Sequence, residues 1–201
     1  MSTSSNLINK AVEQLSKFPG IGQKSALRMA LYLLKKPESE TVDLSQAVLD
    51  LRTQIKFCKQ CFNLSDADLC NVCSSPSKDA SLVCVVKDFQ DVIAIENTGQ
   101  FNGLFHVLGG LISPVDGVGP SDVKIPELLD RVGRGEIKEA IIALSSTLEG
   151  DTTEYYIAKK LREKGVNVST LSKGISVGGE LEYADEMTLA RSIRNRINLE
   201  G

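Results

Sequence analysis

Cys58-Lys-Gln-Cys61-Phe-Asn-Leu-Ser-Asp-Ala-Asp-Leu-Cys70-Asn-Val-Cys73 contains four of the five cysteines of this 201-residue chain. Each Cys-x-x-Cys pair can turn two sulfurs toward one point, and four thiolates around one tetrahedral Zn²⁺ make a closed, structural site. Two disulfides or a redox pair are the alternatives. The N-terminus carries no secretory signal, which disfavours stable disulfides, and a redox motif needs only one pair. The spacing therefore predicts one structural zinc per chain, held by Cys58, Cys61, Cys70 and Cys73.

The composition is that of a soluble globular chain. Apolar residues make up 42% of the sequence, charged residues 24%, and the mean hydropathy is −0.05. No apolar run approaches the roughly 20 residues that a membrane span needs, so we expect a cytoplasmic protein without membrane contact. The fifth cysteine, Cys84, lies in the apolar run 82–86 and is expected to be a small buried hydrophobic residue.

Positive charge is concentrated at the N-terminal end of an otherwise acidic chain. The net charge is −3, yet residues 1–36 carry six basic side chains against one acidic side chain, Glu13. A basic head on an acidic body is consistent with phosphate contacts confined to one end of the protein. Solvated surface lysines give the same pattern, and charge alone favours that interpretation over phosphate contact.

Two amphipathic helices are predicted in this head, over residues 6–18 and 23–36, on either side of Pro19-Gly-Ile-Gly22. This is the form of a helix-hairpin-helix. Gly20 and Gly22 let the turn run close to a phosphate, and backbone N–H groups of the turn and of the second helix point at that anion. Lys24 and Arg28 are four residues apart, hence on one helix face, where they can reach neighbouring phosphates. Such contacts position DNA without reading its sequence; an ordinary helical hairpin is the alternative.

The remainder of the chain is predicted to be α/β. A third helix is expected over residues 44–57, with Asp43 as its N-cap. After the cysteines, strands and helices alternate, which predicts a mostly parallel sheet with helices packed on it. The expected strands are 82–86, 103–108, 140–145 and 166–171; the expected helices are 89–96, 125–132, 153–164 and, near the end of the chain, 185–197.

Two glycine-containing segments follow expected strands. Residues 109–120 contain four glycines and two prolines, which favours a functional loop over a simple connection. Residues 174–179 lack the Lys-Ser/Thr pair that a phosphate-binding loop requires. His106 is the single histidine of the chain, so it has no histidine partner for a metal site and is expected to be structural.

Several longer motifs occur in order along the chain: Phe-Pro-Gly-Ile-Gly-Gln-Lys-Ser-Ala-Leu-Arg-Met-Ala at 18–30, the two Cys-x-x-Cys pairs, Val-Val-Lys-Asp-Phe-Gln-Asp-Val-Ile-Ala-Ile-Glu at 85–96, His-Val-Leu-Gly-Gly-Leu-Ile-Ser-Pro-Val-Asp-Gly-Val-Gly-Pro at 106–120, and Val-Gly-Gly-Glu-Leu-Glu-Tyr-Ala-Asp at 177–185. Together these motifs resemble the RecR family of bacterial recombination mediators over essentially the whole chain.

The resemblance implies a non-catalytic DNA-repair protein made of four parts. They are a helical helix-hairpin-helix head (1–57), a four-cysteine zinc module (58–79), a Toprim α/β domain (80–172) and a C-terminal arm with a helix (173–201). The family is associated with a ring-shaped tetramer that binds single-stranded, double-stranded or gapped DNA. It acts with RecO, and in some settings RecF, to help load RecA, which implies association with the nucleoid during repair. Lys24 and Arg28, with Gly20 and Gly22, would face the DNA.

The residues at the Toprim catalytic positions are altered. Catalytic Toprim enzymes bind Mg²⁺ with a Glu after the first strand and an Asp-x-Asp pair after a later strand. Here Lys87 stands at the first position, where many RecR relatives keep Glu, and Glu149-Gly-Asp151 stands at the later one. A lysine ammonium repels Mg²⁺ and removes an oxygen ligand, and the adjacent Asp88 substitutes only if the strand end rotates. We expect a degenerate acidic site with no catalytic residues; Mg²⁺ binding there stays open.

The favoured hypothesis is therefore a DNA-binding assembly protein and not an enzyme. The alternative is a Mg²⁺-dependent Toprim nuclease or nicking enzyme that uses Glu149, Asp151 and Asp88, against which Lys87 counts. A third hypothesis makes the zinc module and the tail a protein-interaction platform that has no DNA contact of its own.

Overall fold

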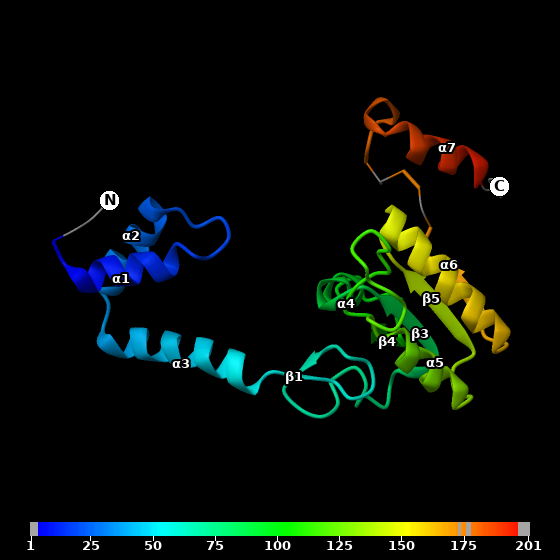
Figure 1. Cartoon of the computed structure of the whole chain (residues 1–201), viewed down its shortest axis with the longest axis horizontal. Coiled ribbons are helices and arrows are strands. Elements are labelled where there is room, and N and C mark those ends of the chain that lie inside the picture. Colours follow the sequence, from blue (N-terminus) through cyan, green and yellow to red (C-terminus); the bar gives the residue numbers. More distant parts are fainter. Residues whose placement is uncertain (1–3, 173, 176–177, 197–201) are drawn as a thin grey trace. The chain divides into compact units, whose positions relative to one another are not determined.

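The computed structural model describes residues 4–172, 174–175 and 178–196, and the chain divides into two compact units, Met1–Ile55 and Lys56–Gly201 (Figure 1). Helices make up the first unit, and the second contains the cysteine segment and a parallel sheet. Within the described residues, no helix is both long enough and apolar enough to cross a membrane.

The first unit begins with the predicted helical pair. Helix α1 spans Asn6–Leu15 and packs against α2, which spans Gln23–Leu33 and buries Ala26 and Ala30. The connection contains a tight turn in which the Ile21 N–H donates to the Phe18 carbonyl at 3.0 Å and Gly20 has a φ of +78°. Pro at the second position and Gly with positive φ at the third define a type II turn, so the Pro-Gly pair accounts for the reversal between the helices.

Helix α3 spans Glu38–Gln54, and its predicted start at residue 44 with Asp43 as N-cap is wrong. Pro37 is the N-cap, with a φ of −54°, and Glu38 and Glu40 lie in the first turn. Residues 38–43 contain too few apolar side chains to show a helical stripe. The helix starts there because Pro37, which is extended with a ψ of 144°, cannot continue the preceding helix and because carboxylates favour the positive end of the helix dipole.

The cysteine segment begins with a short hairpin that the sequence did not predict. Strand β1 (Lys56–Phe57) pairs antiparallel with β2 (Leu64–Ser65), with Phe57 opposite Leu64. This pairing ends the helical path at Gln54, before the predicted helix end at residue 57. Two-residue strands are too short to leave a period-two pattern, which explains why sequence reasoning missed them.

The predicted parallel sheet is confirmed. Its four strands follow the order β4-β3-β5-β6, and every neighbouring pair is parallel. The strands are β3 (Asp79–Val86), β4 (Gly103–Val107), β5 (Glu139–Ala143) and β6 (Asn167–Thr170). The helices between them are α4 (Phe89–Glu96), α5 (Ile125–Gly133) and α6 (Leu148–Glu163). The carboxyl ends of all four strands therefore lie at one edge, where functional groups of open α/β sheets gather.

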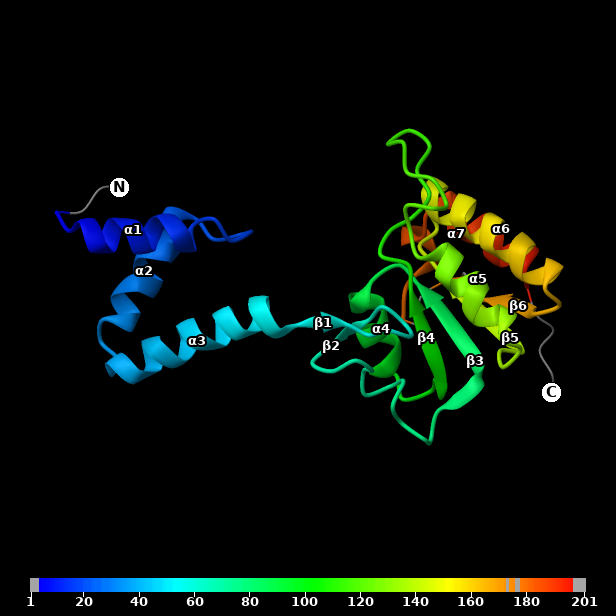
Figure 2. The same ribbon diagram turned by 60° about the horizontal axis from the view of Figure 1, so that its bottom comes forward.

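Both faces of the sheet are covered. On β3, Val83 and Val85 belong to a core shared with α5 and α6, whereas Cys84 and Val86 belong to a second core shared with α4. Figure 2 shows α5 and α6 on one side of the sheet and α4 on the other. Alternate residues of β3 thus face opposite sides of the sheet, which explains why residues 82–86 are a continuous apolar run. Cys84 is buried, as predicted.

Helix α6 starts five residues earlier than the predicted residue 153. Thr147 is its N-cap and accepts a hydrogen bond from the Gly150 N–H at 3.1 Å. Gly150 is typical of a turn in sequence, but here it is buried and any Cβ would collide with the Ser145 carbonyl. Glycine is therefore required inside the first turn of the helix because of a close backbone approach.

The C-terminal arm contains a helix, as predicted. A single 3₁₀ turn spans Leu181–Tyr183, and helix α7 spans Glu186–Arg194, with Asp185 as its N-cap. The predicted helix end at Ile197 lies outside the described residues.

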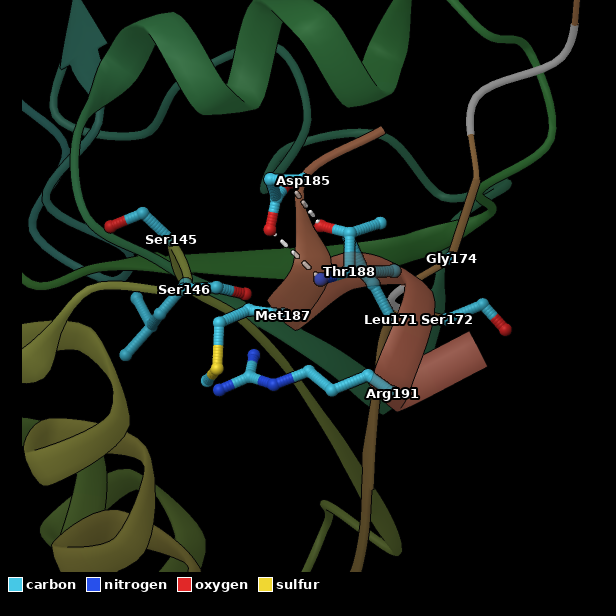
Figure 3. Close-up of a pocket in the computed structure, with 10 residues that line it drawn as sticks. Ser145, Ser146, Leu171, Ser172, Gly174, Asp185, Met187, Thr188 and Arg191 are labelled. Atoms are coloured by element: carbon cyan, nitrogen blue, oxygen red, sulfur yellow. Dashed lines mark hydrogen bonds between the residues drawn. The ribbon is translucent and has the colours of Figure 1, made fainter. Parts of the chain in front are cut away.

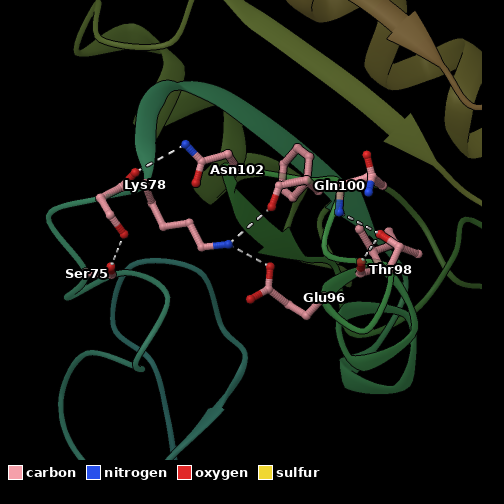
Figure 4. Close-up of polar contacts among 9 residues, drawn as sticks. Ser75, Lys78, Glu96, Thr98, Gln100 and Asn102 are labelled. Carbon is pink, nitrogen blue, oxygen red and sulfur yellow. Dashed lines mark hydrogen bonds and ion pairs between the residues drawn. The ribbon is translucent and has the colours of Figure 1, made fainter.

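The C-terminal end of the cysteine segment forms hydrogen bonds and an ion pair with the sheet domain. The Lys78 ammonium donates to the Glu96 carboxylate at 2.8 Å and to the Phe101 carbonyl at 3.3 Å (Figure 4). Asn102 Nδ2 donates to the Ser77 carbonyl at 3.2 Å. Because Lys78 is largely buried, this ion pair lies in a medium that screens it poorly, and it fixes the approach of the chain to β3.

Candidate metal centre and nucleic-acid interface

The four cysteines converge as predicted. Their sulfurs all lie within 4.8 Å of one another, and Cys61 Sγ is 3.5 Å from Cys70 Sγ. A tetrahedral ion with Zn–S bonds of ~2.3 Å separates its sulfurs by about 3.8 Å, so the arrangement fits zinc closely. Cys58 and Cys61 have no exposed surface, and the Cys70 N–H donates to Cys58 Sγ at 3.4 Å. Cys70 is buried as well and Cys73 is half-buried. An all-sulfur set with no open position is a structural centre and leaves no room for a substrate.

The thiols require a cation to ionise together. Hydrogen bonds with Cys70 and Cys73, followed by burial, raise the pKa of the Cys61 thiol. The hydrogen bond with Cys61 lowers the pKa of Cys70 instead, because the two sulfurs compete for one proton. A bound zinc ion replaces that proton and lets all four sulfurs become thiolates, which couples zinc binding to the folding of this segment.

The metal centre is joined to the exposed edge of the sheet at strand β4. The Val107 N–H donates to the Cys61 carbonyl at 2.8 Å. Phe62, which follows with a φ of +61°, places its ring edge-on to His106 with ring centroids 5.5 Å apart. The Lys124 ammonium lies 5.2 Å from the centroid of the Phe62 ring. The zinc segment therefore covers an edge that would otherwise present unpaired backbone groups.

His106 is structural, in agreement with its isolation in the sequence. It is fully buried, and its Nε2 lies 2.6 Å from the Lys124 carbonyl. Since a carbonyl only accepts hydrogen bonds, Nε2 carries the proton. Burial lowers the pKa of His106 to about 4. The neutral ring thus connects β4 to the start of α5 and binds no metal within the described residues.

The helical hairpin exposes the residues expected at DNA. Lys24 and Arg28 lie on α2 and are exposed, and no ion pair or hydrogen bond engages either side chain within residues 4–172, 174–175 and 178–196. Gly22 is the N-cap of α2 and offers no side-chain cap, and the first turn contains no acidic residue. The helix thus begins with its positive end open to solvent, beside two unpaired cations, which is the chemistry of a phosphate contact.

The predicted acidic positions of the Toprim domain are engaged in local structure. Asp88 is the N-cap of α4 and accepts from the Gln90 N–H at 2.9 Å, while Asp91 accepts from the Asp88 N–H at 3.1 Å. Lys87 is exposed at the end of β3. This reciprocal capping box fixes the Asp88 carboxylate on the helix, so the rotation that would make it a metal ligand costs a helix cap.

The second acidic pair meets a cation from the C-terminal arm. Asp151 lies in the first turn of α6, and its carboxylate is 3.2 Å from the Arg191 guanidinium of α7. Figure 3 shows Arg191 extending from α7 along a pocket of about 570 Å³, with Ser145 and Ser146 across from it. In the described part of the chain, the four cysteines are the one group of three or more Cys, His, Asp or Glu placed to share a metal ion.

Sequence reasoning missed two arginines. Arg191 contacts Asp151 from 40 residues away, and nothing in the sequence indicates that pairing. Arg131 is only 8% exposed, and its Nη1 donates to the Phe105 carbonyl at 2.6 Å. A signal did exist for Arg131, because it lies three residues after the buried Leu128 and so on the apolar face of α5.

Family models match most of the chain in four consecutive segments. The RecR helix-hairpin-helix matches residues 8–51, the RecR four-cysteine zinc finger domain residues 55–75, the Toprim domain residues 81–172 and the RecR C-terminal model residues 174–197. The zinc finger model covers the four converging cysteines, which supports one structural zinc.

Curated relatives agree over the full length. The chain is 53% identical over 200 residues to Recombination protein RecR of Flavobacterium johnsoniae, with 100% of this chain and 97% of the relative aligned. It is 52% identical over 193 residues to Recombination protein RecR of Porphyromonas gingivalis, with 96% and 93% aligned. The identity to the same protein of Bacteroides thetaiotaomicron is 52% over 195 residues, with 97% and 95% aligned. On this similarity, joined to the hairpin, the four-cysteine centre and the parallel sheet, the chain belongs to the RecR family of recombination proteins.

Proposed function

We propose that this chain is a non-catalytic recombination mediator that binds DNA through its helical hairpin. Lys24 and Arg28 carry the proposal, since both are exposed and unpaired in the described chain beside an uncapped, acid-free helix start. These features favour sequence-independent phosphate contacts. Family membership gives the chain a role in recombination and repair; DNA binding by these particular residues is the part that the proposal adds.

The other parts act as a scaffold in this proposal. Zinc folds its segment and activates no water, because the four sulfurs leave no coordination position free. The altered Toprim site cleaves no DNA, because Lys87 repels Mg²⁺ and Asp88 is a helix cap. The chain assembles into a ring-like tetramer, and with a RecO protein, and in some settings RecF, it promotes RecA loading on gapped or single-stranded DNA.

The experiment is a fluorescence-anisotropy titration of labelled gapped DNA with the double variant Lys24→Ala/Arg28→Ala. The matched control is Lys159→Ala/Arg162→Ala, which removes one lysine and one arginine from exposed positions of α6. We expect the hairpin variant to bind at least tenfold more weakly and to show a shallower salt dependence, by about 1–2 in log–log slope. Equal DNA affinities of the two variants would show that the hairpin does not contact the DNA.

Assembly and partner binding are tested separately. Light scattering after size exclusion should give four times the mass of one chain, and immobilised protein should retain a purified RecO protein. A monomeric mass would contradict the ring. If the immobilised protein retains no RecO protein, either alone or when bound to DNA, the mediator role is contradicted.

A further inference from the structure

Two backbone groups of the edge strand β4 are engaged by parts of the second unit other than β3. The Val107 N–H donates to the Cys61 carbonyl at 2.8 Å, and the Phe105 carbonyl accepts from Arg131 Nη1 at 2.6 Å. A zinc ligand and a buried arginine therefore lie along the same short stretch of one edge strand.

Arg131 is buried without a matching carboxylate. It is 8% exposed, no salt bridge to it occurs within the described residues, and its Nη2 is fully enclosed without a hydrogen-bond partner in that part of the chain. A guanidinium does not lose its proton in a protein, so burying it costs free energy unless negative charge lies nearby. Negative charge near the guanidinium, even without a direct ion pair, would offset this cost.

The metal centre adjoins the same stretch of β4, because the Cys61 carbonyl accepts from the Val107 N–H two residues beyond the carbonyl that Arg131 contacts. A pocket of about 470 Å³ is lined by Phe62 and Leu69 of the cysteine segment and by Arg131 of α5. Three carboxylates also line it, those of Glu127, Asp130 and Glu136, but within the described residues none forms an ion pair with Arg131, and Glu127 pairs with Lys124. Burial lowers the pKa of Arg131, and the attractions that oppose this effect come first from Cys73, Cys61 and Cys58, ahead of Glu136. Four thiolates around Zn²⁺ leave a net charge of −2, which is enough to balance the guanidinium without a carboxylate.

We propose that Arg131 is the countercharge of the zinc–thiolate centre, supplied from the Toprim domain and not from the zinc segment itself. Zinc binding and the burial of Arg131 against β4 then stabilise each other through a poorly screened interaction. Arg131 contacts no zinc ligand in this role; it is a positioning and charge-compensating residue outside the ligand set.

Two substitutions separate its charge from its hydrogen bond. Arg131→Lys keeps the positive charge, whereas Arg131→Gln keeps an N–H donor for the Phe105 carbonyl and removes the charge. Arg134→Gln is the matched control, since Arg134 lines the same pocket from an exposed position on the same segment. Zinc affinity is measured on the full-length protein by competition with a chromogenic zinc chelator, and circular dichroism reports folding.

We expect Arg131→Gln to bind zinc at least tenfold more weakly than the unchanged protein, and Arg131→Lys and Arg134→Gln to stay within about threefold. If Arg131→Gln is unfolded as purified, added zinc should restore its circular dichroism, because metal binding and folding are linked. Unchanged zinc affinity in Arg131→Gln, an equal loss in Arg131→Lys, or no recovery at saturating zinc would each overturn the proposal. None of these outcomes depends on DNA binding.

Discussion

The guanidinium of Arg191 lies 3.2 Å from the carboxylate of Asp151, so a cation of the C-terminal arm faces one of the residues predicted from the sequence to form a degenerate Toprim acidic site. The side chains are 33% and 44% exposed, respectively. A cation in contact with this carboxylate compensates its charge without a metal ion. The arm is thereby oriented on the sheet domain that it follows in sequence.

The Asp151–Arg191 pair should orient the arm without adding much stability. A double-mutant cycle with Asp151→Asn and Arg191→Gln, read by urea unfolding, should give a coupling energy of about 0.2–1 kcal/mol, as expected for exposed pairs. The exposed Lys160–Glu163 pair, 3.0 Å apart on α6, is a control of the same class. A coupling above about 2 kcal/mol would contradict this interpretation.

The turn glycines of the hairpin should differ in their tolerance of alanine. A Cβ meets no atom within 4 Å at either Gly20 or Gly22, so only backbone conformation separates them. Gly20 has a φ of +78° and Gly22 a φ of −80°. Gly20→Ala should therefore destabilise the protein by about 1–2 kcal/mol, whereas Gly22→Ala should be close to neutral. Thermal unfolding of both variants checks this, and equal shifts would contradict the type II turn.

Removal of one zinc ligand should abolish zinc binding and unfold the cysteine segment. Cys58→Ser should lose its zinc, measured by elemental analysis, and should show increased protease cleavage within residues 56–75. Cys84→Ala is the control, because Cys84 is buried in the sheet and belongs to no metal group. It should keep one zinc per chain. A folded Cys58→Ser protein that resists protease without zinc would exclude a structural role for the ion.

The buried histidine should make stability depend on pH. Because its pKa is about 4 when folded and 6.5 as a free group, the unfolded chain binds the proton first. The neutral histidine therefore contributes its full stabilisation, about 3 kcal/mol of the free energy of unfolding, above pH 6.5. This contribution is lost as the pH falls toward 4.

The measurement is the free energy of unfolding in urea at pH 7.5 and 5.5, for the unchanged protein and for His106→Gln. Glutamine keeps a donor for the Lys124 carbonyl and does not titrate. The unchanged protein should lose about 1 kcal/mol more than the variant over this range. Parallel losses in the two proteins would show that His106 is accessible to protons in the folded state.

Sequence reasoning succeeded where a local pattern and the tertiary structure agree. Helix α4 has the predicted bounds, and the cysteine spacing indicated the metal ligands, because two Cys-x-x-Cys turns leave few other arrangements. Sequence reasoning failed where a helix starts for reasons that leave no periodic pattern of apolar residues. Pro37 and two glutamates start α3 without an apolar stripe, and the contact of Gly150 with the Ser145 carbonyl places a glycine inside α6.

The contacts that join the cysteine segment and the C-terminal arm to the sheet domain could not be predicted from the sequence, for a different reason. The Val107–Cys61 hydrogen bond and the Asp151–Arg191 pair link residues about 40 or more positions apart, and no local pattern encodes their approach. Arg131 resembles any surface arginine until its position on the apolar face of α5 is considered.

Whether this Toprim domain cleaves DNA decides between a mediator and an enzyme. End-labelled gapped DNA is incubated with purified protein and Mg²⁺ and resolved on a denaturing gel, alongside a Glu149→Ala variant that controls for contaminating nuclease. We predict intact strands with the unchanged protein at concentrations that saturate DNA binding. Cleavage that depends on the protein and disappears in Glu149→Ala would contradict the mediator function and make the chain a Mg²⁺-dependent nuclease.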